Sequence, residues 1–165
     1  MVYVVSANYV SGNLDAVRDM LAHPCALPGL SDGGAHVGSI SDASFPTTLL
    51  AYWARNRGSG RFPVEFIVQR QARDTAWAVG LADRGVLAPG YHADINVIDH
   101  ARLGLRRPEM RFDLPGEGRR LLQRAEGYLH TFVRGQETYA EGEPTDALPG
   151  RLIRGAQRAP GLLSE

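Results

Sequence analysis

The spacing of apolar residues changes near Leu81, and this change restricts the possible folds more than any other feature of the chain. Before it, residues 44–58 and 63–80 repeat apolar side chains at helical spacing. After it, short apolar runs alternate with polar residues between turn dipeptides. The sequence therefore predicts two parts, a helix-containing part over residues 1–84 and a β-rich part over residues 85–165.

The first part has the strand-helix alternation of an α/β fold. Val2 to Val5 form a continuous apolar run, typical of a strand that is covered on both faces. Residues 13–22 change to helical spacing, with Asn13 as the predicted N-cap. A second apolar segment, residues 25–30, leads directly into Asp32 and predicts another strand. This order predicts a parallel sheet whose strand ends face the loop around Asp32.

The second part is predicted to be a small β unit followed by a tail. Residues 101–124 contain seven arginines and little periodicity, so we predict a surface loop with one short helix near Arg119 to Gln123. The tail after Pro149 is expected to cover a sheet edge or to be loose. The strands are predicted at residues 93–99, 128–133 and 136–140, the last two joined by Arg134-Gly135 and followed by a turn at Glu141-Gly142.

Composition excludes several partners and mechanisms. The 18 basic residues are all arginine and balance 18 acidic ones, which argues against nucleic acid as a partner. Without lysine there is no Schiff base and no modified lysine that bridges two metals. Cys25 is the single cysteine, so no internal disulfide is expected and a cytoplasmic location is the default. No run approaches the roughly 18 apolar residues of a membrane span, and we expect no membrane partner.

Asp32 stands in the stretch LPGLSDGGAHVGS, where a predicted strand ends. The carboxyl ends of parallel strands are where catalytic groups gather, which favours a chemical role. An Asp-Gly-Gly sequence also serves simply to turn the chain. The role of His36 is undecided in the same way. Its imidazole can be a ligand, an acid or a substrate contact, or merely a loop side chain bonded to backbone.

The remaining candidates favour structural roles. Cys25 near His23 could suggest a thiol nucleophile, but a buried, inert thiol is the commoner case. No histidine pair has the spacing of a zinc motif, and the Gly33-Gly34 loop lacks the pattern of a phosphate loop. The aromatic residues of the helical segments are expected to pack in the core: Tyr52, Trp53, Phe66 and Trp77.

Three stretches resemble the carboxyl end of the amidohydrolase superfamily. They are GLSDGGAHVG, then QARDTAWAVGLADRGVLAPGYHADINVID, then VRGQETYAEGEPT followed by LPGRLIRG. The combination of SDGGAH with DASFPT is similar to the N-acyl-D-amino-acid deacylase branch, the D-aminoacylase-like proteins. The resemblance covers nearly the whole chain and concerns only the carboxyl-terminal portion of the family.

This resemblance implies a fold and a reaction. The fold would be the end of a metal-dependent (β/α)₈ barrel over residues 1–84 and part of a small β-sandwich over residues 85–165. The reaction would be hydrolysis of the linear amide C–N bond of an N-acyl amino acid, with zinc as the family's metal. Asp32 matches the family's catalytic aspartate, which acts as general base and then acid and can also touch the metal. His36 would lie on the following loop as a substrate-binding residue.

The family's other metal ligands have no counterpart in this chain. We therefore expect it to bind no zinc tightly, to be inactive in isolation, and to need self-association or a complementary chain, since an open sheet has unpaired edges. The leading interpretation is the carboxyl-terminal part of a deacylase. The alternatives are a non-catalytic assembly module and one half of a split enzyme.

Overall fold

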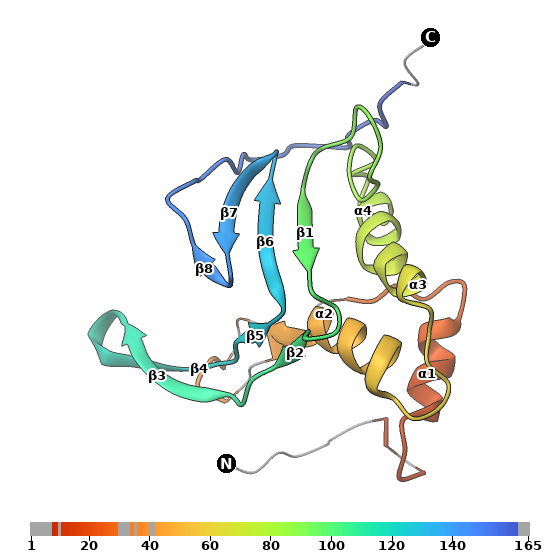
Figure 1. Cartoon of the computed structure of the whole chain (residues 1–165), viewed down its shortest axis with the longest axis vertical. Coiled ribbons are helices and arrows are strands. Elements are labelled where there is room, and N and C mark those ends of the chain that lie inside the picture. Colours follow the sequence, from red (N-terminus) through yellow and green to blue (C-terminus); the bar gives the residue numbers. More distant parts are fainter. Residues whose placement is uncertain (1–7, 10, 30–33, 35, 40–41, 162–165) are drawn as a thin grey trace.

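A computed structural model describes residues 8–9, 11–29, 34, 36–39 and 42–161 of the 165-residue chain. It shows helices packed beside an antiparallel sheet, with a separate two-stranded hairpin projecting from the body (Figure 1). The predicted strand over residues 2–5 lies outside the described residues, and so does Asp32. Among the described residues no helix is long and apolar enough to cross a membrane.

The predicted helices are present. Helix α1 spans Asp15–Ala22, and its first N–H, on Asp15, donates to the side-chain oxygen of Asn13 at 2.9 Å. Asn13 therefore helps to start the helix from one residue outside the N-cap position, which Leu14 occupies. The helical turn η1 (Asp42–Ser44) leads into α2 (Phe45–Thr48), which continues as the wider turns of η2 (Leu49–Asn56).

The second predicted helix is also continuous. Its three consecutive parts are α3 (Val64–Gln69), η3 (Arg70–Asp74) and α4 (Thr75–Ala78). It stops at Gly80, as predicted, where φ is +81° and a side chain would be strained. The tail then pairs with this helix end and not with a sheet edge, because Gln157 donates to the carbonyl of Gly80 and accepts from Ala82 at 2.7 and 3.0 Å.

The core joins the helices to the β part. Trp53 is 4% exposed and Leu103, from the β part, is 0% exposed. Each fully buried side chain of this kind contributes about 1.5–3 kcal/mol. The prediction that all four helical aromatics pack inside is wrong for Trp77, which is 46% exposed and has the guanidinium of Arg73 over its ring. The buried apolar cluster consists of Leu49, Leu50, Trp53, Phe62, Ile67 and Leu103.

The predicted hairpin is confirmed. Strands β6 (Tyr128–Val133) and β7 (Gln136–Ala140) pair antiparallel, and Arg134 and Gly135 between them have φ of +53° and +75°, the values that a tight hairpin turn needs. A second such turn leads to β8 (Glu143–Pro144). Strand β1 (Ile95–Ile98) completes a sheet of order β1-β6-β7-β8.

The prediction of a loop with a short helix over residues 101–124 is wrong. These residues form strands, and their arginines pair with acidic residues, Arg120 with Asp113 across the hairpin at 2.7 Å and Arg111 with Glu109 within β3 at 2.6 Å. The turn between β3 and β4 is η4 (Pro115–Glu117). The strands here are β2 (Gly104–Leu105), β3 (Glu109–Leu114), β4 (Gly118–Leu122) and β5 (Ala125–Glu126).

The described residues form no parallel sheet and no closed barrel. Residues 25–29, at the start of the strand predicted before Asp32, are not a strand. Pro28 has no N–H for a ladder, and the carbonyl of Ala26 is bound by the Arg70 side chain instead of by a neighbouring strand. Apart from one bridge between Leu81 and Gln157, the observed strand pairs are antiparallel.

Candidate functional site

The candidate site is the loop around Asp32 and His36, of which the structure describes residues 34 and 36–39. His36 is exposed and has a left-handed backbone with φ of +48°. Its carbonyl accepts a hydrogen bond from the N–H of Ser39 at 2.8 Å, which closes a tight turn. The structure therefore leaves the imidazole of His36 open to solvent, while the position of Asp32 lies outside the described residues.

Arg70 fixes the segment that runs into this loop. Its guanidinium donates to the carbonyls of Ala26, His23 and Pro24 at 3.0, 3.3 and 3.4 Å. The Arg70 side chain is only 14% exposed and lies over the ring of Phe66, 5.1 Å from its centroid. A charged donor that satisfies several carbonyls in a partly buried place stabilises that local conformation. The chain between α1 and the Asp32 loop is thus held against α3 and η3.

The loop is also tied on its far side to the β part. The N–H of Leu121 in β4 donates to the carbonyl of Val37 at 2.6 Å. Any side chain at Gly38 would contact the Arg119 side chain, whose Nε would be 3.5 Å away. Both sides of the loop are therefore held by contacts that reach across the fold.

The helix that follows the loop is attached to the β part as well. The Ser44 hydroxyl donates to the side-chain oxygen of Gln123 at 2.6 Å. The hydroxyls of Thr47 and Tyr128 are 2.9 Å apart. Further along the chain, the Arg55 guanidinium donates to the backbone carbonyls of His100 and Leu103 in the β part. These polar contacts fix the direction in which the chain leaves the loop.

Cys25 is exposed, so the prediction of a buried thiol is wrong. Its backbone N–H donates to Nδ1 of His23 at 3.2 Å, so this ring nitrogen faces the backbone. The segment lies at the surface because its neighbour Arg70 takes up the carbonyls on the inner side. The observed Cys25–His23 contact is therefore a local turn and not a thiol-imidazole pair.

The described residues do not fit a metal centre. No group of three His, Cys, Asp or Glu side chains converges among them. Histidine–carboxylate pairs occur at His130 with Glu137 and at Asp83 with His92, whose Nε2 is 3.1 Å from the Asp83 carboxylate. The Asp83 carboxylate also binds Arg84 at 2.9 Å, and this hydrogen bond holds the pKa of Asp83 below its usual range. A carboxylate already neutralised by a guanidinium is a poor cation ligand.

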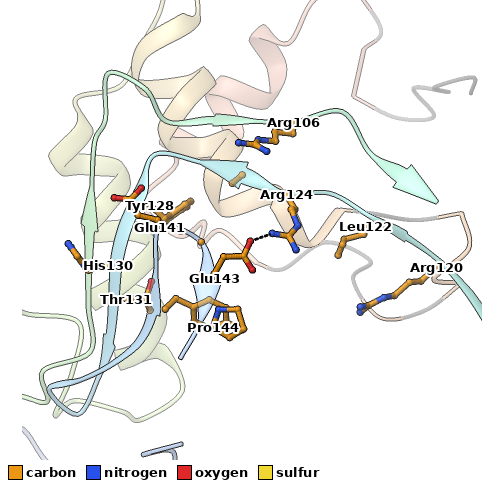
Figure 2. A pocket seen from close by; sticks show the side chains of 13 residues that line it. Arg106, Arg120, Leu122, Arg124, Tyr128, His130, Thr131, Glu141, Glu143 and Pro144 are labelled. Carbon is orange, nitrogen blue, oxygen red and sulfur yellow. Dashed lines mark hydrogen bonds and ion pairs between the residues drawn. The ribbon is translucent and has the colours of Figure 1, made fainter. Parts of the chain in front are cut away.

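A cavity of about 550 Å³ lies between the hairpin β3–β4 and strands β6 to β8 (Figure 2). Its wall includes Arg106, Arg120 and Arg124. All three arginines are already paired, Arg124 with Glu143 at 2.5 Å, Arg120 with Asp113 at 2.7 Å and Arg106 with Glu126 at 3.7 Å, so the wall is largely neutralised. The cavity can accept a polar molecule, but its observed pairs supply no activated nucleophile.

Sequence reasoning missed Arg70 and the pairing of Arg84 with Asp83. Arg70 belongs to a regular helical pattern, and nothing local indicates that its side chain binds carbonyls 44 to 47 residues earlier. The Asp-Arg-Gly sequence at residues 83–85 was a usable signal, because it places opposite charges next to a glycine at a turn. There φ of Gly85 is +80°, and an added Cβ would be 2.7 Å from the carbonyl oxygen of Ala72.

Comparison with known proteins identifies the family. The family model described as "Amidohydrolase family" matches residues 5–139, which include the Asp32 loop, the helices and most of the β part. The chain belongs to the amidohydrolase family. One similar protein is the D-aminoacylase of Alcaligenes xylosoxydans xylosoxydans, which is 34% identical to this chain over 110 residues. The resemblance predicted from the sequence motifs is thus confirmed.

The match to that relative is partial. The aligned residues are 67% of this chain and 20% of the D-aminoacylase, so the chain spans about one fifth of its relative's length. No solved structure matches the chain.

Proposed function

We propose that the chain contributes the acid/base residue of a hydrolase that cleaves the amide C–N bond of N-acyl amino acids, as a D-aminoacylase-like enzyme. The observation that carries this proposal is the amidohydrolase match over residues 5–139, together with the similarity to a D-aminoacylase. The contacts on both sides of the Asp32 loop support it, because a catalytic loop needs a fixed support.

Asp32 is the proposed general base and acid. A carboxylate at this position would take a proton from the attacking water and return it to the departing nitrogen, so that the amine leaves as a neutral group. General acid/base catalysis by one side chain contributes about 10²–10⁴-fold to the rate. The loop conformation held by Arg70 and by the Val37–Leu121 hydrogen bond would keep this carboxylate in place.

His36 is the proposed substrate contact. It lies four residues after Asp32, is exposed, and sits in a backbone turn that fixes its Cα. A neutral imidazole can donate or accept a hydrogen bond with an acyl oxygen or a carboxylate. This role affects substrate binding more than the proton transfer.

Zinc is the proposed metal of the complete enzyme, within a (β/α)₈ barrel that continues beyond the described elements. Because the described side chains do not fit a metal site, its ligands are proposed to come from other residues of a longer protein or from a complementary chain. It follows that the 165-residue chain alone binds zinc weakly and does not turn over substrate.

The first experiment assays the purified 165-residue chain with Zn²⁺ and N-acetyl-D-amino acids. We expect no hydrolysis above the buffer rate and no tight zinc binding in equilibrium dialysis. Turnover by this chain, abolished by chelation, would contradict the proposal that ligands come from elsewhere.

Reading the DNA upstream of the Met1 codon identifies the form to test next, since an in-frame His-x-His sequence indicates a longer enzyme.

The second experiment uses that longer protein, or the chain with its complement. Asp32→Asn is expected to lower kcat by about 10²–10⁴-fold, and His36→Ala to raise KM by about tenfold with a smaller effect on kcat. His130→Ala, which removes an imidazole paired with Glu137 at 2.5 Å, is the matched control. Full activity of Asp32→Asn would rule out the catalytic role and leave a non-catalytic assembly module as the better account.

A further inference from the structure

The β3–β4 arm, residues 109–122, has an open edge. Strand β3 pairs with β4, and among the described strands no other lies beside it. The arm projects from the body in Figure 1, so its outer edge faces away from the main sheet. A two-stranded ribbon is only marginally stable in water, and an open edge is a template for another strand.

A backbone hydrogen bond of β4, on the opposite side of the arm, shows which backbone groups of β3 face its open edge. The N–H of Leu121 donates to Val37, outside the hairpin ladder. Leu121 lies opposite Met110 in the register of β3 and β4. When one member of an antiparallel pair points its backbone groups away from its partner, the other member does the same. The N–H and C=O of Met110 therefore point outward, along the open edge.

The side chains of β3 divide into two faces. Glu109, Arg111 and Asp113 lie on one face, where Arg111 pairs with Glu109 at 2.6 Å and Arg120 pairs with Asp113. Met110 and Phe112 alternate with them, and they are 39% and 68% exposed. Exposed apolar side chains beside an open edge gain stability when a second strand is placed against them.

The order of charges favours a second copy of the same strand, and together with the register shift after Arg111 it favours one register. A pair centred on Phe112 would also join opposite charges, Arg111 with Asp113, but it would lie across that shift. In an antiparallel pair centred on Arg111, that arginine would oppose itself and Glu109 would oppose Asp113, so like charges meet. Centred on Met110, Glu109 opposes Arg111 of the other copy. The same register places Arg107 opposite Asp113 and Pro108 opposite Phe112, so that opposite charges and apolar groups meet.

We propose that the chain forms a twofold dimer in which the open edges of β3 from two copies pair antiparallel about Met110. The result is a continuous ribbon of four strands, ordered β4, β3, then β3 and β4 of the other copy. Met110 exchanges two backbone hydrogen bonds with its counterpart, in the part of β3 that precedes the register shift after Arg111. The formal net charge of zero adds no long-range repulsion between copies. This dimer is independent of the proposed hydrolase function.

The charge register provides the first test, measured by sedimentation equilibrium of the 165-residue chain between about 1 and 200 μM. We expect a monomer–dimer equilibrium. R111E places two acidic side chains opposite each other at two points of the ribbon, and should raise the dimer dissociation constant at least about tenfold. The double variant E109R/R111E restores both the internal and the cross-copy pairs and should restore the dimer. R151E, which makes the same charge change in the exposed tail, should have no effect.

A disulfide provides the second test. In the ribbon the Cα atoms of the two Met110 residues are about 5.5 Å apart, within the range that a disulfide bridges. In a Cys25→Ser background, M110C is expected to form a covalent dimer under mild oxidation. E109C should not, because it opposes position 111 of the other copy. A chain that is monomeric throughout overturns the proposal, and so does a dimer that R111E and the cysteine positions do not affect.

Discussion

The helical core and the β3–β4 arm are stabilised in different ways. In the core, Leu103 is fully buried among Leu49, Trp53 and their neighbours, so the free energy of folding comes from apolar burial. The arm has no buried side chain among its described residues, and besides its own ladder and the Leu121–Val37 hydrogen bond it is held by ion pairs between half-exposed groups. Such pairs contribute little, typically 0–1 kcal/mol on the surface, as a rough range. The difference is the one that the proposed dimer requires, because the arm would then gain from a second copy the stability that its own contacts do not supply.

Leu103→Ala should have the largest effect. It removes a 0% exposed side chain from the junction of the two parts, and we expect a loss of about 3–4 kcal/mol in the free energy of unfolding, measured in urea. The control is Leu148→Ala, at a residue that is 93% exposed, with an expected change below about 0.5 kcal/mol. Equal losses for the two variants would contradict the location of the core.

Gly127→Ala should have the next largest effect on the free energy of unfolding. Gly127 has φ of +93°, and an added Cβ would lie 2.6 Å from Cα of Leu103. The clash and the backbone strain together should cost about 2–3 kcal/mol in urea unfolding. Gly116→Ala, in the arm, has φ of +68° but an open surrounding, so only strain of about 1 kcal/mol is expected. A harmless Gly127→Ala would show that Gly127 and Leu103 do not pack this closely within the β part.

Arg70→Met tests the support of the Asp32 loop. Methionine keeps much of the apolar stem but loses the three carbonyl contacts of the guanidinium, and we expect about 2 kcal/mol less stability. Amide hydrogen exchange should become faster between residues 24 and 29. A general loss of packing would instead speed up exchange outside this segment as well. Arg61→Met is the control, because within the described part of the chain the Arg61 side chain makes one exposed hydrogen bond, at 3.3 Å. Unchanged amide exchange in Arg70→Met would show that Arg70 does not support the segment before the Asp32 loop.

Asp83→Asn should have the smallest effect, a loss of unfolding free energy that is present at neutral pH and disappears in acid. The hydrogen bond from Arg84 lowers the pKa of Asp83 in the folded chain below its ordinary value of 3.8. The stabilisation is therefore present above pH 4 and is lost as the pH falls through the folded pKa. The variant should show a flatter decline of unfolding free energy in this acid range. An unchanged acid slope would mean that Asp83 does not contribute to the pH dependence.

Local signals explain what could be predicted of the fold. Prolines and glycines bound the two helices, and Arg134-Gly135 supplies the left-handed turn of the β6–β7 hairpin. The arm was missed because its alternating charges look like a solvated loop until their partners across the hairpin are known. Residues 25–29 failed as a strand because a strand needs a neighbour, and a distant arginine took the place of that neighbour.

The candidate site was accessible from the sequence only through resemblance. Residue types alone left Asp32 and His36 open between a turn and a chemical role, and the family match adds the hydrolase context. Their structural support could not be predicted, because Arg70 and Leu121 reach the loop from 44 to 84 residues away. Contacts at such separation are set by tertiary packing and leave no local pattern.

The central claim, that the core is stable alone while the arm depends on a second copy, is tested most directly by amide hydrogen exchange at two protein concentrations. We predict that protection of the amides in η2, around Trp53, does not change with concentration. Protection of the Met110 amide should rise as the chain dimerises, since it becomes a donor across the new edge. Equal protection of this amide at low and high concentration would contradict the claim.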